Sequence, residues 1–254
     1  MNNNKLIEKI REKRDFSQLP LKDVELAFRK FERRECSNEE KIDLTKDLLR
    51  KVFSAFVSHK ILSLKEKDEE WILRKHLSTR ERLPHYKEIY KRILKSSKKE
   101  INIFDLGAGI NGFSYKYFPK GTSYFAIEAV GQLVDLMNFY FKKKRIKGKA
   151  IHESLFELEK IKNIIKGIKG EKILFLFKVI DSLEMIERDY SKKLLKKIAP
   201  LCEKVVVSFA TRSMIRRERF KINRNWLIVF VKENFKILDE FEIGGEKYIV
   251  FKAR

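Results

Sequence analysis

The sequence is short of cysteine and of long apolar runs, and each shortage excludes a class of protein. Its two cysteines, Cys36 and Cys202, are too few and too far apart for a disulfide framework or a cysteine metal cage. The four histidines show no metal-ligand spacing with the cysteines or with one another. No apolar run approaches the ~20 residues of a membrane span, and the first residues lack the apolar core of a signal peptide. We therefore expect a cytoplasmic protein with no structural metal and no membrane partner.

Acidic side chains are also scarce relative to basic ones. The 254 residues include 58 lysines and arginines but only 36 aspartates and glutamates, which gives a net charge of +22. The excess is +9 in residues 1–100 and +13 in residues 101–254, so it is not confined to a tail. Such a field attracts polyanions and favours a nucleic-acid partner. The alternative is a lysine-rich, solvated surface of the kind found in heat-adapted proteins.

Residues 1–99 show helical patterns and almost no strand signals. Helices are expected near residues 4–14, 21–34, 38–58 and 69–77, with a Ser37 or Asn38 cap on the third. A last helix, capped by Ser78 or Thr79 and with Pro84 in its first turn, is expected to reach Ile93. Core packing accounts for the apolar stripes, and the basic residues are left on outer faces. We predict a helical domain over residues 1–99 whose basic faces are free to meet a nucleic acid.

Residues 100–254 alternate between strand and helix patterns, which predicts an α/β fold with a parallel sheet and crossover helices. The strand candidates are Ile101–Leu106, Ser123–Glu128, Ala150–His152, Ile173–Lys178 and Lys204–Phe209. The helix candidates are Gln132–Lys144, Lys160–Lys166, Leu183–Ile198 and Asn225–Asn234. Two final strands, Phe235–Phe241 and Lys247–Lys252, flank Gly244-Gly245 as an antiparallel hairpin. A parallel Rossmann-like sheet that ends in a hairpin resembles the class I methyltransferases more than the dehydrogenases.

The first strand candidate runs into a glycine-rich turn, in the sequence INIFDLGAGINGF. Asp105 is followed by Gly107 and Gly109, where a Cβ would obstruct a ligand or forbid the turn. A helix after the turn would direct its free N–H groups at that ligand. The spacing G-A-G-I-N-G matches the dinucleotide fingerprint, whereas D-L-G-A-G is similar to the S-adenosylmethionine loop of methyltransferases. The loop alone therefore leaves both cofactors open, and the hairpin favours S-adenosylmethionine.

Two charged residues end later strand candidates. Glu128 can accept hydrogen bonds from both ribose hydroxyls of either cofactor, or it can cap the helix that follows. Lys178 follows a very apolar strand, and a buried unpaired ammonium is costly, so it either reaches out to a cleft or has a functional role. Beyond the fifth strand, the basic stretch SMIRRERFKINR is either a substrate-contacting loop or a solvated face.

Three segments together resemble a known family: HLSTRERLPHYKEIY, FDLGAGINGF and VVVSFATRS. They are similar to the Arm family of aminoglycoside-resistance methyltransferases, which act on small-subunit ribosomal RNA. The resemblance implies a class I methyltransferase domain over residues 100–254, preceded by the helical RNA-binding domain. It also implies S-adenosylmethionine as cofactor and N7 of a guanine as the methyl acceptor. Because that nitrogen attacks through a lone pair, no general base is required.

The resemblance also implies roles for individual residues. Arg82 would meet the methionine carboxylate of the cofactor, with Ser78 and Thr79 close by. The remaining cofactor residues would be Asp105, Gly107, Gly109, Glu128, Ser154 and Leu155. Lys178 and Arg212 would lie near the target base. We expect a monomer whose partner is ribosomal RNA or the small ribosomal subunit; an NAD-dependent oxidoreductase and a non-catalytic RNA-binding protein are the alternatives.

Overall fold

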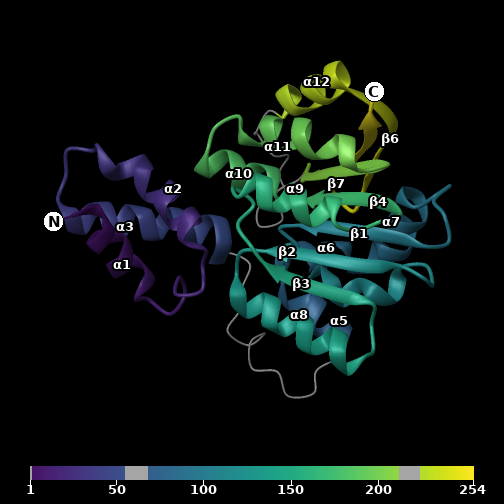
Figure 1. The fold of residues 1–254 in the computed structure, drawn as a ribbon, viewed down its shortest axis with the longest axis horizontal. Coiled ribbons are helices and arrows are strands. Elements are labelled where there is room, and N and C mark those ends of the chain that lie inside the picture. The colour runs from purple at the N-terminus through teal and green to yellow at the C-terminus, as the bar shows by residue number, and fades with distance from the viewer. Residues whose placement is uncertain (1, 55–67, 212–223) are drawn as a thin grey trace.

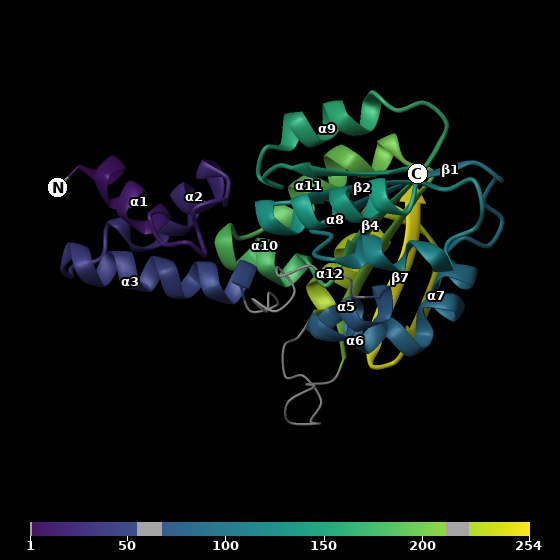
Figure 2. The same cartoon turned by 90° about the horizontal axis from the view of Figure 1, so that it is seen from below.

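The computed structural model describes residues 2–54, 68–211 and 224–254. The first three helices are α1 (Asn3–Arg11), α2 (Leu21–Glu32) and α3 (Asn38–Leu49), and α3 continues as the π-helical turn η1 (Arg50–Ser54). The predicted cap of α3 is at Ser37, where a reciprocal capping box joins Ser37 and Glu40. The part of this predicted helix from residue 55 onward lies outside the described residues. In Figures 1 and 2 these helices project to one side of the molecule.

The single helix predicted from Ser78 or Thr79 to Ile93 is divided into two helices in the structure. After α5 (Glu69–Lys75) come α6 (Leu77–Arg82), the 3₁₀ turn η2 (Leu83–His85) and α7 (Tyr86–Ile93). Pro84 lies in the turn because proline has no N–H and clashes with the carbonyl four residues earlier, so a continuous α-helix cannot include it. The predicted cap at Ser78 or Thr79 is wrong, because Thr79 is buried inside α6 and its hydroxyl donates to the Leu73 carbonyl at 2.6 Å.

Seven strands form one sheet in the order β3-β2-β1-β4-β5-β7-β6. The strands are β1 (Ile101–Leu106), β2 (Ser123–Glu128), β3 (Gly148–His152), β4 (Glu171–Phe177), β5 (Lys204–Ala210), β6 (Phe235–Ile243) and β7 (Glu246–Ala253). The first five are parallel, and β7 is antiparallel to both of its neighbours. The predicted parallel sheet with a closing hairpin is therefore confirmed.

Helices cover both faces of the sheet (Figure 2). On one face lie α5, α6, α7 and α8 (Gly131–Lys143); on the other lie α9 (Leu158–Lys166), α10 (Ile180–Ile186), α11 (Tyr190–Ile198) and α12 (Asn225–Asn234). The single helix expected over Leu183–Ile198 is two helices, because the chain breaks at Asp189, which has a φ of +61°. Helices α5–α7 therefore belong to the layer on the sheet, whereas α1–α3 extend beyond it. The domain boundary at residue 99 stays a prediction.

Candidate active site

The glycine loop begins directly after β1 and requires both of its glycines. Gly107 and Gly109 have φ angles of +68° and +56°, a conformation that strains any residue with a Cβ. A Cβ on Gly107 would lie 2.6 Å from Val179 Cγ2, and one on Gly109 would lie 3.1 Å from Nε2 of His76. Burial, with the charges of Arg82 and Lys178 nearby, lowers the pKa of His76 to about 3. The expected α-helix after the loop is instead the 3₁₀ helix η3 (Asn111–Tyr117).

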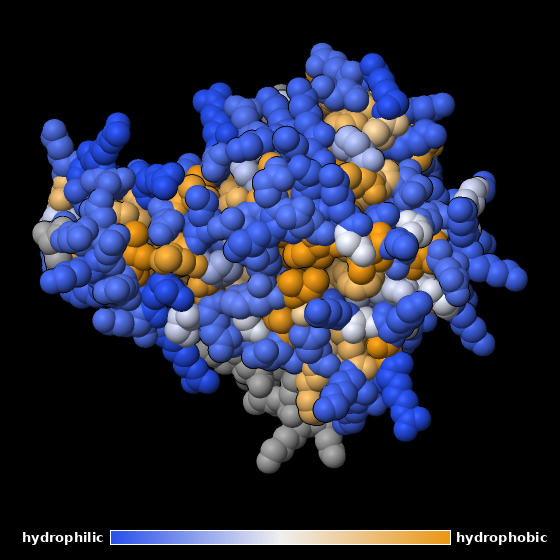
Figure 3. All heavy atoms as spheres, viewed as in Figure 1, coloured by the Kyte–Doolittle hydropathy of each residue, from blue (hydrophilic) through white to orange (hydrophobic). Residues whose placement is uncertain are grey.

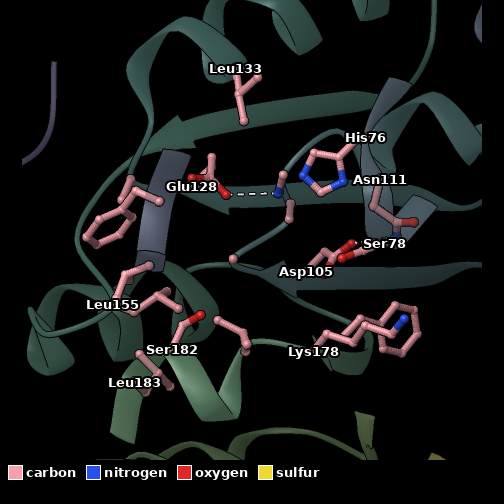
Figure 4. Close-up of a pocket in the computed structure, with 18 of the residues that line it drawn as sticks. His76, Ser78, Asp105, Asn111, Glu128, Leu133, Leu155, Lys178, Ser182 and Leu183 are labelled. Atoms are coloured by element: carbon pink, nitrogen blue, oxygen red, sulfur yellow. Dashed lines mark hydrogen bonds between the residues drawn. The ribbon is translucent and has the colours of Figure 1, made fainter. Parts of the chain in front are cut away.

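Two buried acids hold this loop in place. Asp105 accepts hydrogen bonds from Asn111 Nδ2 at 2.7 Å and from the Tyr124 hydroxyl at 2.5 Å, and burial raises its pKa to about 6. Glu128 accepts from the backbone N–H of Gly109 at 2.8 Å, drawn as a dashed line in Figure 4. Its second oxygen accepts from the N–H of Val130, the N-cap of α8, at 2.9 Å. Glu128 thus caps the helix and fixes the loop, and a carboxylate has lone pairs left for a ligand.

Arg82 is almost fully buried, and only some of its guanidinium nitrogens have hydrogen-bond partners among the described residues. Its Nε donates to both carboxylate oxygens of Glu246, at 3.1 and 3.0 Å, and its Nη1 to Asn111 Oδ1 at 3.5 Å. Its Nη2 has no hydrogen-bond partner among the residues described. The guanidinium lies over the ring of Phe177, 4.8 Å from its centroid. A buried guanidinium nitrogen without an acceptor suits a carboxylate ligand, because that pairing is bidentate and charge-assisted.

Lys178 follows β4 and is held between two acids. Its Nζ forms ion pairs with Glu81 and, at 3.2 Å, with Glu246. The Lys178 backbone has a φ of +57°, and its N–H donates to the Ser208 carbonyl at 3.1 Å. Such backbone conformations cost energy and gather at functional sites. The ammonium is therefore neither unpaired nor free in solvent, and the pairs with Glu81 and Glu246 fix its position beside Arg82.

These groups surround one pocket, which lies beyond the carboxyl ends of β1, β2 and β4 (Figure 4). The strand order reverses between β1 and β4, and ligands of open α/β sheets bind at such a switch point. Nine of the eleven predicted site residues line it: Ser78, Thr79, Arg82, Asp105, Gly107, Gly109, Glu128, Leu155 and Lys178. Their individual roles stay predictions.

Of the other two predicted residues, only Ser154 is described by the structure, and it does not line the pocket. Ser154 is fully buried, and its hydroxyl accepts from the Phe156 N–H at 3.1 Å. Arg212 lies outside the described residues, as does nearly all of the basic stretch after β5. Its last member, Arg224, pairs with Asp181 at 2.6 Å. That residue therefore faces a carboxylate of this chain.

Sequence reasoning missed several residues of the site. Asp23, His76 and Asn111 line the pocket, and Glu81 and Glu246 pair with its cations. His76 and Glu81 lie inside the HLSTRERLPHYKEIY segment and Asn111 lies inside FDLGAGINGF, so these three carry a local signal, whereas Asp23 and Glu246 carry none. In the described ranges, no helix is long and apolar enough to cross a bilayer. Within the same ranges, no three His, Cys, Asp or Glu side chains converge as a metal site would require.

The seven-stranded sheet, with an antiparallel seventh strand and a glycine loop at its switch point, is the fold of the class I methyltransferases. The chain belongs to the FmrO family of ribosomal RNA methyltransferases, because a sequence model of that family matches residues 33–235. The dehydrogenase interpretation of the G-x-G-x-x-G spacing is therefore wrong.

Three relatives show how far the similarity extends. A 16S rRNA (guanine(1405)-N(7))-methyltransferase of Proteus mirabilis is 26% identical over 191 residues, which are 70% of this chain and 63% of that protein. The crystal structure of the 16S rRNA methyltransferase RmtF with S-adenosyl-L-homocysteine matches with a TM-score of 0.81 at 17% identity, over all of both chains. The 16S rRNA methylase RmtB matches with a TM-score of 0.78 at 20% identity, over 100% of this chain and 99% of its own.

Proposed function

We propose that this protein is an S-adenosylmethionine-dependent methyltransferase that acts on N7 of a guanine in 16S ribosomal RNA. The observation that carries the proposal is the pocket, in which the glycine loop, an acid at the end of β2 and a partly satisfied buried arginine face one space. The FmrO family match supports the RNA substrate. The names of the relatives, one of them solved with S-adenosylhomocysteine, support the target atom and the cofactor.

The pocket residues fit this cofactor along its length. The Nη2 of Arg82, which lacks a partner within the described structure, suits the methionine carboxylate. Glu128 has lone pairs left for the ribose hydroxyls. Leu155, Val179 and Leu183 supply apolar walls for the adenine ring. When bound, the cofactor supplies an electrophilic methyl group on its sulfonium sulfur.

The reaction at a guanine N7 requires alignment rather than proton removal. That nitrogen attacks through a lone pair and carries no proton, so the residues of this chain need only position the base and stabilise charge. We assign Lys178 to the side of the target base, because Glu81 and Glu246 hold its ammonium at the rim of the pocket. Arg212 keeps the same assignment on the strength of the sequence resemblance.

The partner we infer is ribosomal RNA within the small subunit. A net charge of +22 supports a polyanionic partner, and hydrophilic residues cover much of the face in Figure 3. We assign the RNA contacts chiefly to the helical part, residues 1–99. We also propose that the protein acts as a monomer, and a ribosomal substrate supports a cytoplasmic location.

A binding and transfer experiment tests the proposal. Calorimetry should show that S-adenosylhomocysteine binds and NAD does not. With a cofactor labelled on its methyl group, label should enter 16S ribosomal RNA of small subunits, and the Glu128→Ala variant should transfer far less. Binding of NAD in place of S-adenosylhomocysteine, or absence of label from the RNA, would overturn the proposal.

A further inference from the structure

An acid from the N-terminal helices lies in the pocket and has no assigned role. Asp23 is in the first turn of α2, is 1% exposed, and lines the pocket together with Val52 and Phe53 from η1. It precedes residue 33, where the FmrO family match begins. Helix α2 reaches this position because it contacts α10, and Leu26 of α2 belongs to the same apolar cluster as Leu155. The N-terminal helices therefore form one wall of the cofactor pocket.

Among the residues that the structure describes, no cation pairs with the carboxyl of Asp23. Its Oδ2 is buried and has no hydrogen-bond partner in the part of the chain that the structure describes. Burial raises its pKa to about 7, opposed by a hydrogen bond with the Ser154 hydroxyl and reinforced by the nearby charges of Glu128 and Glu153. Tyr190 is a further ionisable group within electrostatic range. A buried acid with an open acceptor costs free energy, and packing of α2 alone does not require one.

We propose that Asp23 is a further cofactor-binding residue, whose carboxylate accepts a hydrogen bond from a hydroxyl or amino group of the adenosine part of the cofactor. The inference rests on the proposed cofactor. Its neighbours place it at that end: Glu128 is the candidate ribose acid, and Ser154 follows the end of β3. The contact makes a bound cofactor a bridge between the sheet and α2. Occupancy of the pocket thereby stabilises the docking of the N-terminal helices.

The contact also makes cofactor binding depend on pH. A donor from the ligand stabilises the carboxylate, so the pKa of Asp23 is lower in the complex than in the empty pocket. The ligand therefore prefers the deprotonated protein, and affinity rises as pH increases through about 7. Glu128 faces the same space, and burial raises its pKa as well. The contribution of Asp23 to the pH dependence of affinity must therefore be obtained as the difference between wild type and an Asp23 variant.

The test uses the full-length protein, calorimetry with S-adenosylhomocysteine at pH 6, 7 and 8, and thermal unfolding without ligand. Asp23→Ala should weaken binding at pH 8 by about tenfold or more, the value of one hydrogen bond to a charged group. It should leave the unliganded Tm unchanged or higher, because it removes an unsatisfied buried acid. Asp23→Asn should lose most of the rise in affinity between pH 6 and pH 8. Asp43→Asn, which removes an exposed carboxyl from α3, should match wild type.

Three analogues identify the group that donates. If the Asp23→Ala penalty disappears with S-inosylhomocysteine, the donor is the adenine amino group; if it disappears with a 2′-deoxyribose or a 3′-deoxyribose analogue, the donor is the hydroxyl that the analogue lacks. A penalty that persists with all three, or a variant with wild-type affinity, would overturn the inference. So would a lower unliganded Tm with unchanged pH dependence, which would make Asp23 structural. Failure of the wild type to bind S-adenosylhomocysteine would instead refute the proposed function itself.

Discussion

At the scale of single residues, the site is held together by ion pairs between side chains from distant parts of the chain. Glu246, at the start of β7, accepts from Arg82 of α6 and from the Ser208 hydroxyl of β5 at 2.5 Å, and it also pairs with Lys178. Burial tends to raise the pKa of Glu246, but the charges of Arg82 and Lys178 lower it below its usual value. Removing one partner of a buried pair leaves the other charge uncompensated, which typically costs about 3–5 kcal/mol.

Arg82→Ala should therefore lower both stability and cofactor affinity, whereas Arg82→Lys should lower cofactor affinity with much less loss of stability. A lysine can still pair with Glu246, so its free energy of unfolding should fall much less than that of the alanine variant. It has no second nitrogen for a carboxylate, so S-adenosylhomocysteine binding should weaken by about tenfold or more. Denaturant unfolding and calorimetry on both variants check this. Wild-type affinity in a folded Arg82→Lys protein would move the carboxylate contact to another residue.

Glu128→Ala should lose most of the affinity for S-adenosylmethionine. Two hydrogen bonds to a charged group would disappear, at about 1.5–3 kcal/mol each. Because the carboxylate also holds the N–H groups of Gly109 and Val130, part of the loss would come from a looser loop. Calorimetry measures the change, with Asp135→Asn on the exposed side of α8 as control. Unchanged binding would place the ribose elsewhere.

At the scale of elements, the local patterns predicted the strands well and the breaks poorly. The bounds of β1, β2 and α12 were predicted correctly because β-branched and aromatic runs or apolar periodicity end at clear turn signals. The break between α10 and α11 depends on Asp189 in a left-handed conformation, which no glycine marks. Asp23 and Glu246 were missed because their neighbours in space belong to other elements of the chain, with Arg82 lying 164 residues from Glu246, and a pattern within one segment does not contain that information.

Gly107→Ala should distort the loop between β1 and η3. The φ of +68° and the 2.6 Å approach to Val179 both oppose a Cβ, so the variant should lose about 1–3 kcal/mol of stability and much of its cofactor affinity. Gly167→Ala is the matched control, since Gly167 has a φ of −66° at the end of α9 and its nearest neighbour, the Asn163 carbonyl, is 3.3 Å away. Equal effects of the two substitutions would contradict the account of the loop.

At the scale of the whole molecule, the helices of residues 1–99 fall into two groups, one packed on the sheet and one that extends beyond it. Helices α5–α7 bury Leu73, Tyr86, Tyr90 and Ile93 against the sheet, so a chain that began near Ser96 would lack these residues and expose the apolar face of the sheet that they cover. Helices α1–α3 extend beyond the sheet and reach the pocket through α2. RNA contacts on this part would thus lie next to the residues that close the cofactor site.

RNA binding by the full-length protein should fall steeply as salt increases. Each phosphate neutralised by a lysine or arginine releases counterions, so the logarithm of the association constant should decrease linearly with the logarithm of salt concentration. Filter binding or fluorescence anisotropy with small subunits between 50 and 200 mM salt measures the slope. S-adenosylhomocysteine binding should change far less over the same range, because its contacts are buried. A flat RNA titration would contradict an electrostatic interface.

The measurement that tests the central claim most directly is the chemical position of the transferred methyl group. Small ribosomal subunits are incubated with the enzyme and cofactor, and the 16S ribosomal RNA is then mapped by mass spectrometry and by reductive strand scission at 7-methylguanine. We predict one added methyl group, on N7 of a single guanine, and far less methylation with the Glu128→Ala variant. A methyl group on a base amino group or a ribose hydroxyl, either of which requires loss of a proton, would contradict the account.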